Sequence, residues 1–114
     1  MTRWQQQVEE AEEGCSWSWP EFSNDLGCRT ALAAEWPQLA VPVREAWEPE
    51  LRRLDERFRA ATIPWPGPGG GRWWMRRIPR LIEAEAVAGC DERGWPVGWE
   101  MMPFAKPDAV RVSF

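Results

Sequence analysis

Residues 63–71, IPWPGPGGG, constrain the fold more than any other segment of the chain. Three prolines and four glycines in nine residues disfavour both helix and strand, so this segment is expected to be a connector. Apolar residues recur every three or four positions before it and alternate after it, as in helices and strands, respectively. We therefore predict a single domain over residues 1–114. It has a helical part over about 1–62, the connector, and a β part over about 72–114.

The helical part is expected to begin with two short helices. The first spans residues 2–13 and ends at Gly14, a residue that commonly follows helices. The next residues, 15–25, read CSWSWPEFSND and are predicted to form a loop, because Ser, Pro and Asn favour turns. A second helix is predicted from about residue 24 or 29 to residue 35. It is stopped there because the residue before Pro37 disfavours the helical conformation.

The third helix has the clearest pattern. Pro49 fits the first turn of a helix over 48–62, where its missing N–H is not needed. Val43 and Trp47 extend the apolar side of this helix backwards, so a kinked helix from Pro42 is the alternative. Within 48–62 the apolar residues recur at helical spacing, and they are Leu51, Leu54, Phe58 and Ala61.

The β part is predicted from a turn. Residues 91–94, Asp-Glu-Arg-Gly, are flanked by alternating residues over 81–102, which favours an antiparallel hairpin with Cys90 facing Trp95. Small residues of one strand then lie opposite large residues of the other. A helix over 79–89 is the competing interpretation, because Glu and Ala favour helices. The predicted pairs are Ala88 with Val97, Ala86 with Trp99 and Ala84 with Met101.

Two further strands are expected beside this hairpin. Residues 72–79, RWWMRRIP, supply one of them. Residues 109–114, AVRVSF, supply the other, with Val110, Val112 and Phe114 on the buried side. The predicted fold class is α+β, in which N-terminal helices pack on a three- or four-stranded antiparallel sheet in the C-terminal half.

The same hairpin register gathers charged residues on its outer face. Glu85 lies across from Glu100, and like charges directly opposite each other destabilise a sheet. Arg111 on the closing strand points to that face and can compensate them. A catalytic carboxylate pair is disfavoured, because such chemistry also needs a cleft and a raised pKa. A salt-bridge lattice and a polar binding site are the two open interpretations of this set, which consists of Glu83, Glu85, Glu100 and Arg111.

Ten tryptophans in 114 residues indicate a role in recognition. Each indole buries about 150–250 Å² and needs a partner for its N–H, so one small core hardly accommodates ten. Trp17 and Trp19 lie in the polar loop and are expected either to fold back on the core or to form an exposed anchor for a partner. Trp73 and Trp74 lie among arginines in RWWMRR, a grouping that can stack bases and neutralise phosphates. The alternative for RWWMRR is a strand with one buried and one outward indole.

The chain contains no histidine, which is the usual general base near neutral pH and the commonest metal ligand. Cys15, Cys28 and Cys90 form no CxxC pair and are expected to be reduced thiols rather than zinc ligands. Residues 63–71 match neither of the glycine-rich phosphate-binding patterns, GxxxxGK[ST] and GxGxxG. We therefore expect no enzymatic activity, no cofactor and no metal.

The formal net charge of −4 favours a basic partner over nucleic acid. Asp55 and Arg59 are four residues apart on the predicted third helix and are expected to form an ion pair. The N-terminal residues lack the apolar stretch of a leader peptide, and no apolar run reaches transmembrane length. A cytoplasmic protein without a membrane segment is expected.

These features predict a small protein that binds another protein through exposed tryptophan and an acidic surface. Inhibitors, immunity-type neutralisers and assembly adaptors are of this class. A small-ligand or carbohydrate module that uses tryptophan and the Glu/Arg face is the first alternative. A single-stranded nucleic-acid binder that uses RWWMRR is the second. The predicted partner-contacting residues are Trp17, Trp19, Trp73 and Trp74.

Overall fold

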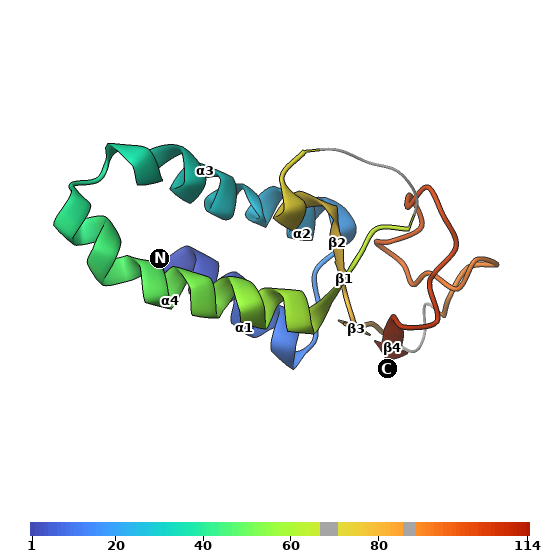
Figure 1. Cartoon of the computed structure of the whole chain (residues 1–114). Coiled ribbons are helices and arrows are strands. Elements are labelled where there is room, and N and C mark those ends of the chain that lie inside the picture. The colour runs from blue at the N-terminus through green and yellow to red at the C-terminus, as the bar shows by residue number, and fades with distance from the viewer. Residues whose placement is uncertain (67–70, 86–88) are drawn as a thin grey trace.

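The computed structural model of the chain describes residues 1–66, 71–85 and 89–114. It is an α+β fold with helices in the N-terminal half and two small sheets formed mostly by the C-terminal half (Figure 1). The molecule is elongated, with extents of 51 × 28 × 20 Å. The elements in chain order are α1 (Thr2–Glu13), α2 (Trp19–Asp25), α3 (Gly27–Glu35), η1 (Trp36–Gln38), α4 (Val41–Ala61), β1 (Thr62–Pro64), η2 (Trp73–Arg76), β2 (Arg77–Pro79), β3 (Leu81–Glu83) and β4 (Arg111–Ser113).

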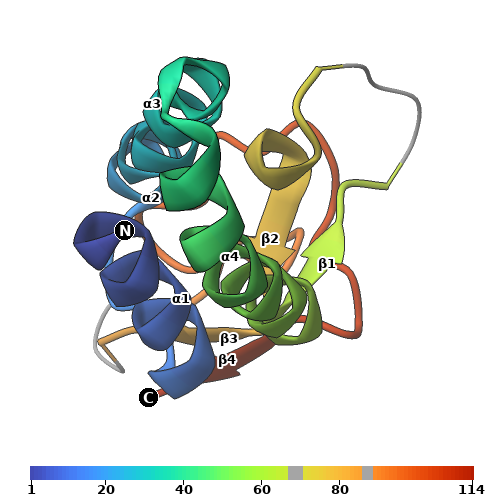
Figure 2. The same ribbon diagram turned by 60° about the vertical axis from the view of Figure 1, so that its left-hand side comes forward.

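Helix α1 confirms the predicted first helix. It ends at Gly14, which adopts φ 119°, and the Gly14 N–H donates to the Glu10 carbonyl. A positive φ of this size favours glycine because it has no Cβ. The helix buries one side, which includes Trp4 and Val8, against α4 (Figure 2). The rings of Trp4 and Phe58 contact each other there at a tilt of 42°, with their centroids 4.8 Å apart.

Helix α2 lies in the segment that was predicted to be a loop, and that prediction is wrong. The Ser18 Oγ accepts a hydrogen bond from the Glu21 N–H at 3.4 Å and lies 2.8 Å from a carboxylate oxygen of the same glutamate. Pro20 occupies the first turn. Ser-x-x-Glu followed by helix is the capping-box pattern, so the sequence does contain a local signal for this helix.

Helix α4 is continuous from Val41 to Ala61, with Pro49 inside it. The helix therefore has the extent of the alternative that began at Pro42, and the shorter helix over 48–62 is wrong. Proline inside a helix removes one backbone hydrogen bond. The buried residues of α4 are all in its C-terminal half, and they are Leu51, Leu54 and Phe58.

The β part differs from the predicted antiparallel sheet of three or four strands. Strands β1 and β2 form an antiparallel pair, and β3 and β4 form a parallel pair. Cys15 makes a further parallel bridge to Ile82 of β3, which places the chain after α1 beside this second sheet. The strand predicted over 72–79 forms only at its end, as β2, because the preceding residues form η2.

The hairpin over 81–102 is also wrong, although its turn is present. The Asp91 side chain accepts hydrogen bonds from the backbone N–H groups of Arg93 and Trp95, and Gly94 adopts φ 90°. Cys90 bridges Pro96 rather than Trp95, a shift of one residue. The predicted partners Ala86 and Ala88 lie outside the described residues. Proline and glycine end the ladder because Pro96 cannot donate a hydrogen bond and Gly98 has φ 96°.

Tight turns therefore replace the second strand of the predicted hairpin. The N–H of Trp99 donates to the Pro96 carbonyl, and the N–H of Met102 donates to the Trp99 carbonyl. These turns bury the indoles of Trp95 and Trp99, which stack 6.0 Å apart, and leave Val97 and Met101 exposed. Phe114 is 63% exposed, so its predicted place on the buried side is wrong, whereas Val110 is fully buried.

Aromatic side chains from both halves of the chain meet in one core. The ring centroid of Trp19 lies 5.6 Å from those of Trp65 and Trp99, and Phe22 stacks on Phe58 with their centroids 6.4 Å apart. Such ring pairs stabilise the fold beyond the area that they bury. In the part of the chain that the structure describes, no helix has both the length and the apolarity to cross a membrane.

Candidate functional site

Three segments that are distant in sequence enclose a groove of about 540 Å³. They are the chain between α1 and α2, the end of β3 with the residues after it, and the turn at 97–99. The groove brings together two predicted sets, because Trp17 lines it beside Glu83 and Glu85. The other residues that line it are Ser16, Ser18, Glu21, Ala84, Val97, Gly98 and Trp99.

The segment before α2 is docked on the 97–99 turn by its backbone. The indole N–H of Trp99 donates to the Trp17 carbonyl at 3.1 Å, and the Trp19 N–H donates to the Gly98 carbonyl at 2.8 Å. A Cβ on Gly98 would lie 3.0 Å from the Ser18 Cβ, so only glycine allows this approach. The backbone of Trp17 is therefore fixed by the core.

The indole of Trp17 does not follow its backbone into the core. The residue is 44% exposed, and it is one of the large apolar residues left at the surface. Val97, which also lines the groove, is 69% exposed. Two apolar side chains thus face solvent around a hollow, which is typical of a site that contacts another molecule.

The groove is also acidic. Glu21, Glu83 and Glu85 line it, and none of the described lining residues is Lys or Arg. The salt bridges among the described residues include none of these three glutamates. Gly14 leaves room for Glu83, because a Cβ at position 14 would lie 2.9 Å from a carboxylate oxygen of that residue. The groove therefore favours a ligand with both positive charge and apolar surface.

Glu100 and Arg111, the other two residues of the predicted charged face, do not line the groove. Glu100 accepts a hydrogen bond from the Gly98 N–H at 2.6 Å, so its carboxylate caps the turn beside the groove. Arg111 is exposed on β4, and it takes part in none of the salt bridges among the described residues. Because β4 pairs in parallel with β3 and Glu100 lies in a turn, the predicted Glu85–Arg111–Glu100 lattice is not formed by the described residues.

The other predicted partner-contacting tryptophans pack inside the molecule. Trp19 is half-buried among core rings, as the interpretation of a lid on the core expected. Trp74 is 4% exposed, and its indole N–H donates to the Thr30 hydroxyl at 2.9 Å. Trp73 is half-buried beneath the guanidinium of Arg59, 3.9 Å from the ring centroid. Of the four predicted residues, Trp17 is the one that the structure leaves open.

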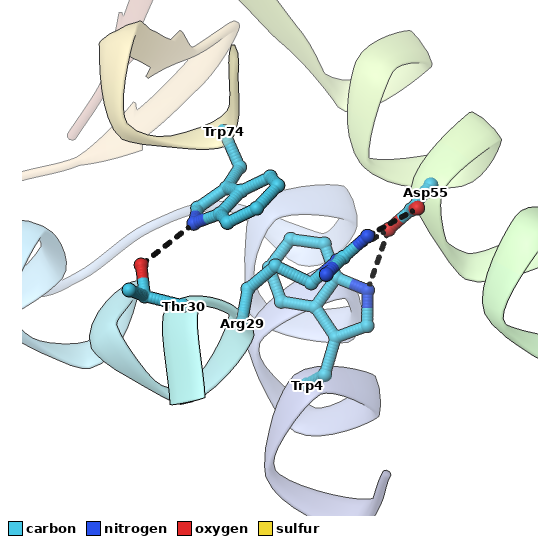
Figure 3. A network of polar contacts seen from close by, with 5 residues as sticks. All are labelled: Trp4, Arg29, Thr30, Asp55 and Trp74. Carbon is cyan, nitrogen blue, oxygen red and sulfur yellow. Dashed lines mark hydrogen bonds and ion pairs between the residues drawn. The ribbon is translucent and has the colours of Figure 1, made fainter. Parts of the chain in front are cut away.

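A polar network behind Trp74 was not predicted (Figure 3). Arg29 and Asp55 form a bidentate ion pair at 2.9 and 3.0 Å, and the indole N–H of Trp4 donates to the same carboxylate at 3.0 Å. Arg29 also lies 4.3 Å from the centre of the Trp74 ring. The predicted Asp55–Arg59 pair is therefore wrong. Asp55 faces inward, and a bidentate hydrogen-bonded ion pair with arginine is stronger at such a buried position than at the surface.

The described residues include no group of three or more His, Cys, Asp or Glu side chains positioned to hold a metal ion. The three cysteines are free thiols. Burial raises the pKa of the Cys15 thiol to about 12, so this sulfur is not a nucleophile near neutral pH. Cys28 is half-buried, and burial raises its pKa as well.

The sequence contained partial signals for the groove. The exposure of Trp17 was one of the two predicted alternatives, and the glutamates were predicted as a polar face. Glu21 and Val97 were missed because the first lies on an unpredicted helix and the second was assigned to a strand.

The chain matches no protein-family model, no curated protein and no solved structure. The chemistry of the groove therefore carries the functional proposal.

Proposed function

We propose that the protein binds a basic segment of another protein in this groove. The observation that carries the proposal is an indole 44% exposed at the edge of a hollow lined by Glu21, Glu83 and Glu85. Tryptophan is enriched among residues that dominate binding energy. Carboxylates around it attract and orient lysine or arginine side chains of the partner.

This binding role is of the kind that inhibitors, immunity-type neutralisers and assembly adaptors share. We propose binding rather than catalysis. The chain has no histidine, and the buried thiol at Cys15 stays protonated at neutral pH. The three free cysteines favour a reducing compartment, so we propose that the partner is met in the cytoplasm.

The proposal is tested by affinity capture with wild-type protein and three variants. Trp17→Ala removes the apolar anchor, and Glu83→Gln with Glu85→Gln removes the charge while keeping the shape. Trp47→Ala is the matched control, because it removes another exposed indole, outside the groove. We expect a partner that the control retains and that both groove variants lose.

Calorimetry with the captured protein then measures the effect. Loss of a central interface tryptophan costs at least about 2 kcal/mol, so Trp17→Ala should weaken binding more than about tenfold. The affinity of the variant with Glu83→Gln and Glu85→Gln should depend much less on the salt concentration than that of the wild-type protein. Equal capture by wild-type protein and both groove variants would contradict the proposal.

A small ligand is the alternative occupant of the same groove. Its volume of about 540 Å³ falls within the usual range for ligand sites, roughly 300–1,000 Å³. An indole beside carboxylates suits a cationic amine or a sugar ring. Tryptophan fluorescence titrated with choline, lysine methyl ester and simple sugars tests this alternative, and Trp17→Ala should abolish any response. The RWWMRR segment is not proposed as a nucleic-acid site, because Trp74 is buried and Arg59 covers Trp73.

A further inference from the structure

A second pocket lies where α1 passes the junction of α2 and α3 (Figure 2). Its volume of about 490 Å³ is within the usual range for small-molecule sites, roughly 300–1,000 Å³. It shares no residue with the groove at Trp17, so it is a separate site, which we call the α1 pocket. The lining residues that carry a charge or a side-chain amide are Arg3, Gln6, Gln7, Glu10, Asn24 and Asp25.

Gln7 provides a hydrogen-bond donor that the fold does not use. The residue is 4% exposed, and none of the described residues accepts a hydrogen bond from its Nε2. Gln5, on the outer side of the same helix, is exposed and donates to the Glu9 carboxylate at 3.2 Å. Buried polar groups are nearly always hydrogen-bonded, because an unpaired one destabilises the fold. An unpaired buried amide in the wall of a pocket therefore points to an acceptor that a ligand supplies.

Charges of both signs line the α1 pocket without pairing. Arg3 and Glu10 lie on the same side of α1 as Gln7, since positions 3, 7 and 10 follow the helical repeat. Seven residues separate the two charged positions, which is about 10 Å along the helix axis. Asp25, at the end of α2, adds a second carboxylate. The salt bridges among the described residues include none of these three charged side chains, so all three are available to a ligand.

We propose that the α1 pocket binds a small zwitterion of the dipeptide type. The carboxylate of the ligand accepts hydrogen bonds from Arg3 and from the Nε2 of Gln7, and its ammonium group donates to Glu10 and Asp25. An extended dipeptide is at most about 7 Å long, and the side chains of Arg3 and Glu10 supply the remaining reach. A single amino acid carries both charges on one Cα, so it meets only one end of the pocket.

The experiment uses the full chain, and isothermal titration calorimetry at pH 7 measures its affinity for matched probes. Alanyl-alanine is the zwitterion. Its N-acetyl derivative lacks the ammonium group, and its C-terminal amide lacks the carboxylate, so each probe keeps the dipeptide and loses one charge. We expect alanyl-alanine to bind and each derivative to bind at least about tenfold more weakly, because each loses charged hydrogen bonds. Free alanine should also bind at least about tenfold more weakly, because it spans only one end.

Variants locate the binding. Gln7→Leu removes the amide and keeps most of its bulk. It should weaken alanyl-alanine at least about tenfold and yet unfold at the same or a higher urea concentration, because the fold loses no hydrogen bond. Gln5→Leu is the matched control on the outer side of α1 and should bind like the wild-type protein. Arg3→Gln should bind alanyl-alanine and its amide equally. Glu10→Gln with Asp25→Asn should bind alanyl-alanine and its acetyl derivative equally.

Four results would overturn the proposal. The first is the absence of binding of alanyl-alanine, and the second is equal affinity of the wild-type protein for alanyl-alanine and its two derivatives. The third is unchanged affinity in Gln7→Leu, or a lower stability of this variant, which would mean that the amide is paired within the fold. The fourth is a loss of alanyl-alanine binding in Trp17→Ala, which would place the ligand in the groove. If Gln7→Leu cannot be purified, Arg3→Gln decides, and a retained preference for the free carboxylate would contradict the site.

Discussion

The two halves of α4 carry the same apolar stripe in different surroundings. In the second half, Leu54 and Phe58 are fully buried, and Asp55 is paired with Arg29. In the first half, Val43 and Trp47 stay open to solvent. An amphipathic pattern therefore specifies which side of a helix is apolar, but not how much of that side the rest of the chain covers.

The largest expected effect is on the covered half. Asp55→Ala leaves the Arg29 guanidinium and the Trp4 indole N–H without their acceptor. Breaking a buried ion pair by removing one partner costs about 3–5 kcal/mol. Urea unfolding followed by tryptophan fluorescence measures this loss. Asp55→Asn should lose less, because an amide oxygen still accepts from Trp4. A loss below about 1 kcal/mol in Asp55→Ala would mean that the network resembles a surface pair.

A matched pair of truncations compares the two halves directly. Leu54→Ala should cost about 2–5 kcal/mol, because it leaves a cavity at a fully buried site. Val43→Ala removes a side chain from the same stripe and should change stability by no more than about 0.5 kcal/mol. Both values come from the same unfolding assay. Similar losses for the two variants would show that the first half of α4 is covered in the free protein.

Alkaline pH weakens the core through Cys15, a buried residue that follows Gly14 at the end of α1. Burial raises the pKa of this thiol from its ordinary value of 9.0 to about 12. The unfolded state then releases its proton first, so the stabilisation is complete below pH 9 and is lost as pH rises towards 12. The slope is about 1.4 kcal/mol per pH unit.

This slope is measurable because the chain has no tyrosine and one lysine, so few other groups titrate there. Urea unfolding at several pH values between 8 and 10.5 is the measurement. Cys15→Ala is the control and should unfold with a flatter pH dependence. The same slope in both proteins would contradict the burial of this thiol in solution.

The smallest effect concerns the exposed contact between α1 and α4. Arg57 donates to the Glu12 carboxylate and holds its pKa below the ordinary value of 4.5. Its stabilisation is therefore present above pH 4.5 and is lost as pH falls through the lowered value. Both side chains are about one-third exposed, so solvent screens the pair and Arg57→Ala should lower the stability only slightly at pH 7. Chemical unfolding at pH 7 and pH 3 should show the difference shrinking in acid, and a constant difference would assign it to packing.

Much of the helical part was predictable because its signals are local. Gly14 ends α1 as expected, and the stripe of α4 was read correctly back to Val43. The turn at 91–94 was also predicted, since an Asp side chain and a glycine with positive φ act within four residues. Helix α2 was missed although its capping residues Ser18 and Glu21 are only three positions apart in the sequence. The Ser, Pro and Asn content of this segment is typical of a loop, but the Ser18 cap starts a helix there.

The candidate site was predictable only in pieces. Trp17 was a candidate anchor, and Glu83 and Glu85 were candidates for a polar face, but the sequence placed them on separate surfaces. Their meeting depends on Cys15 pairing with β3 and on the Trp99 indole bonding the Trp17 carbonyl. Both contacts join segments more than sixty residues apart, so no local pattern encodes them.

The sequence by itself determined the α+β class, the helical stripe, the helix end at Gly14 and the 91–94 turn, because spacing, capping and φ preferences act over a few residues. The tertiary structure alone decided which strands pair, that Asp55 takes Arg29 rather than Arg59, and which indoles stay outside. These choices follow from desolvation and close packing among distant segments. Trp17 lies between two serines and Trp74 lies among arginines, and only the packing of the whole molecule buries Trp74 and exposes Trp17.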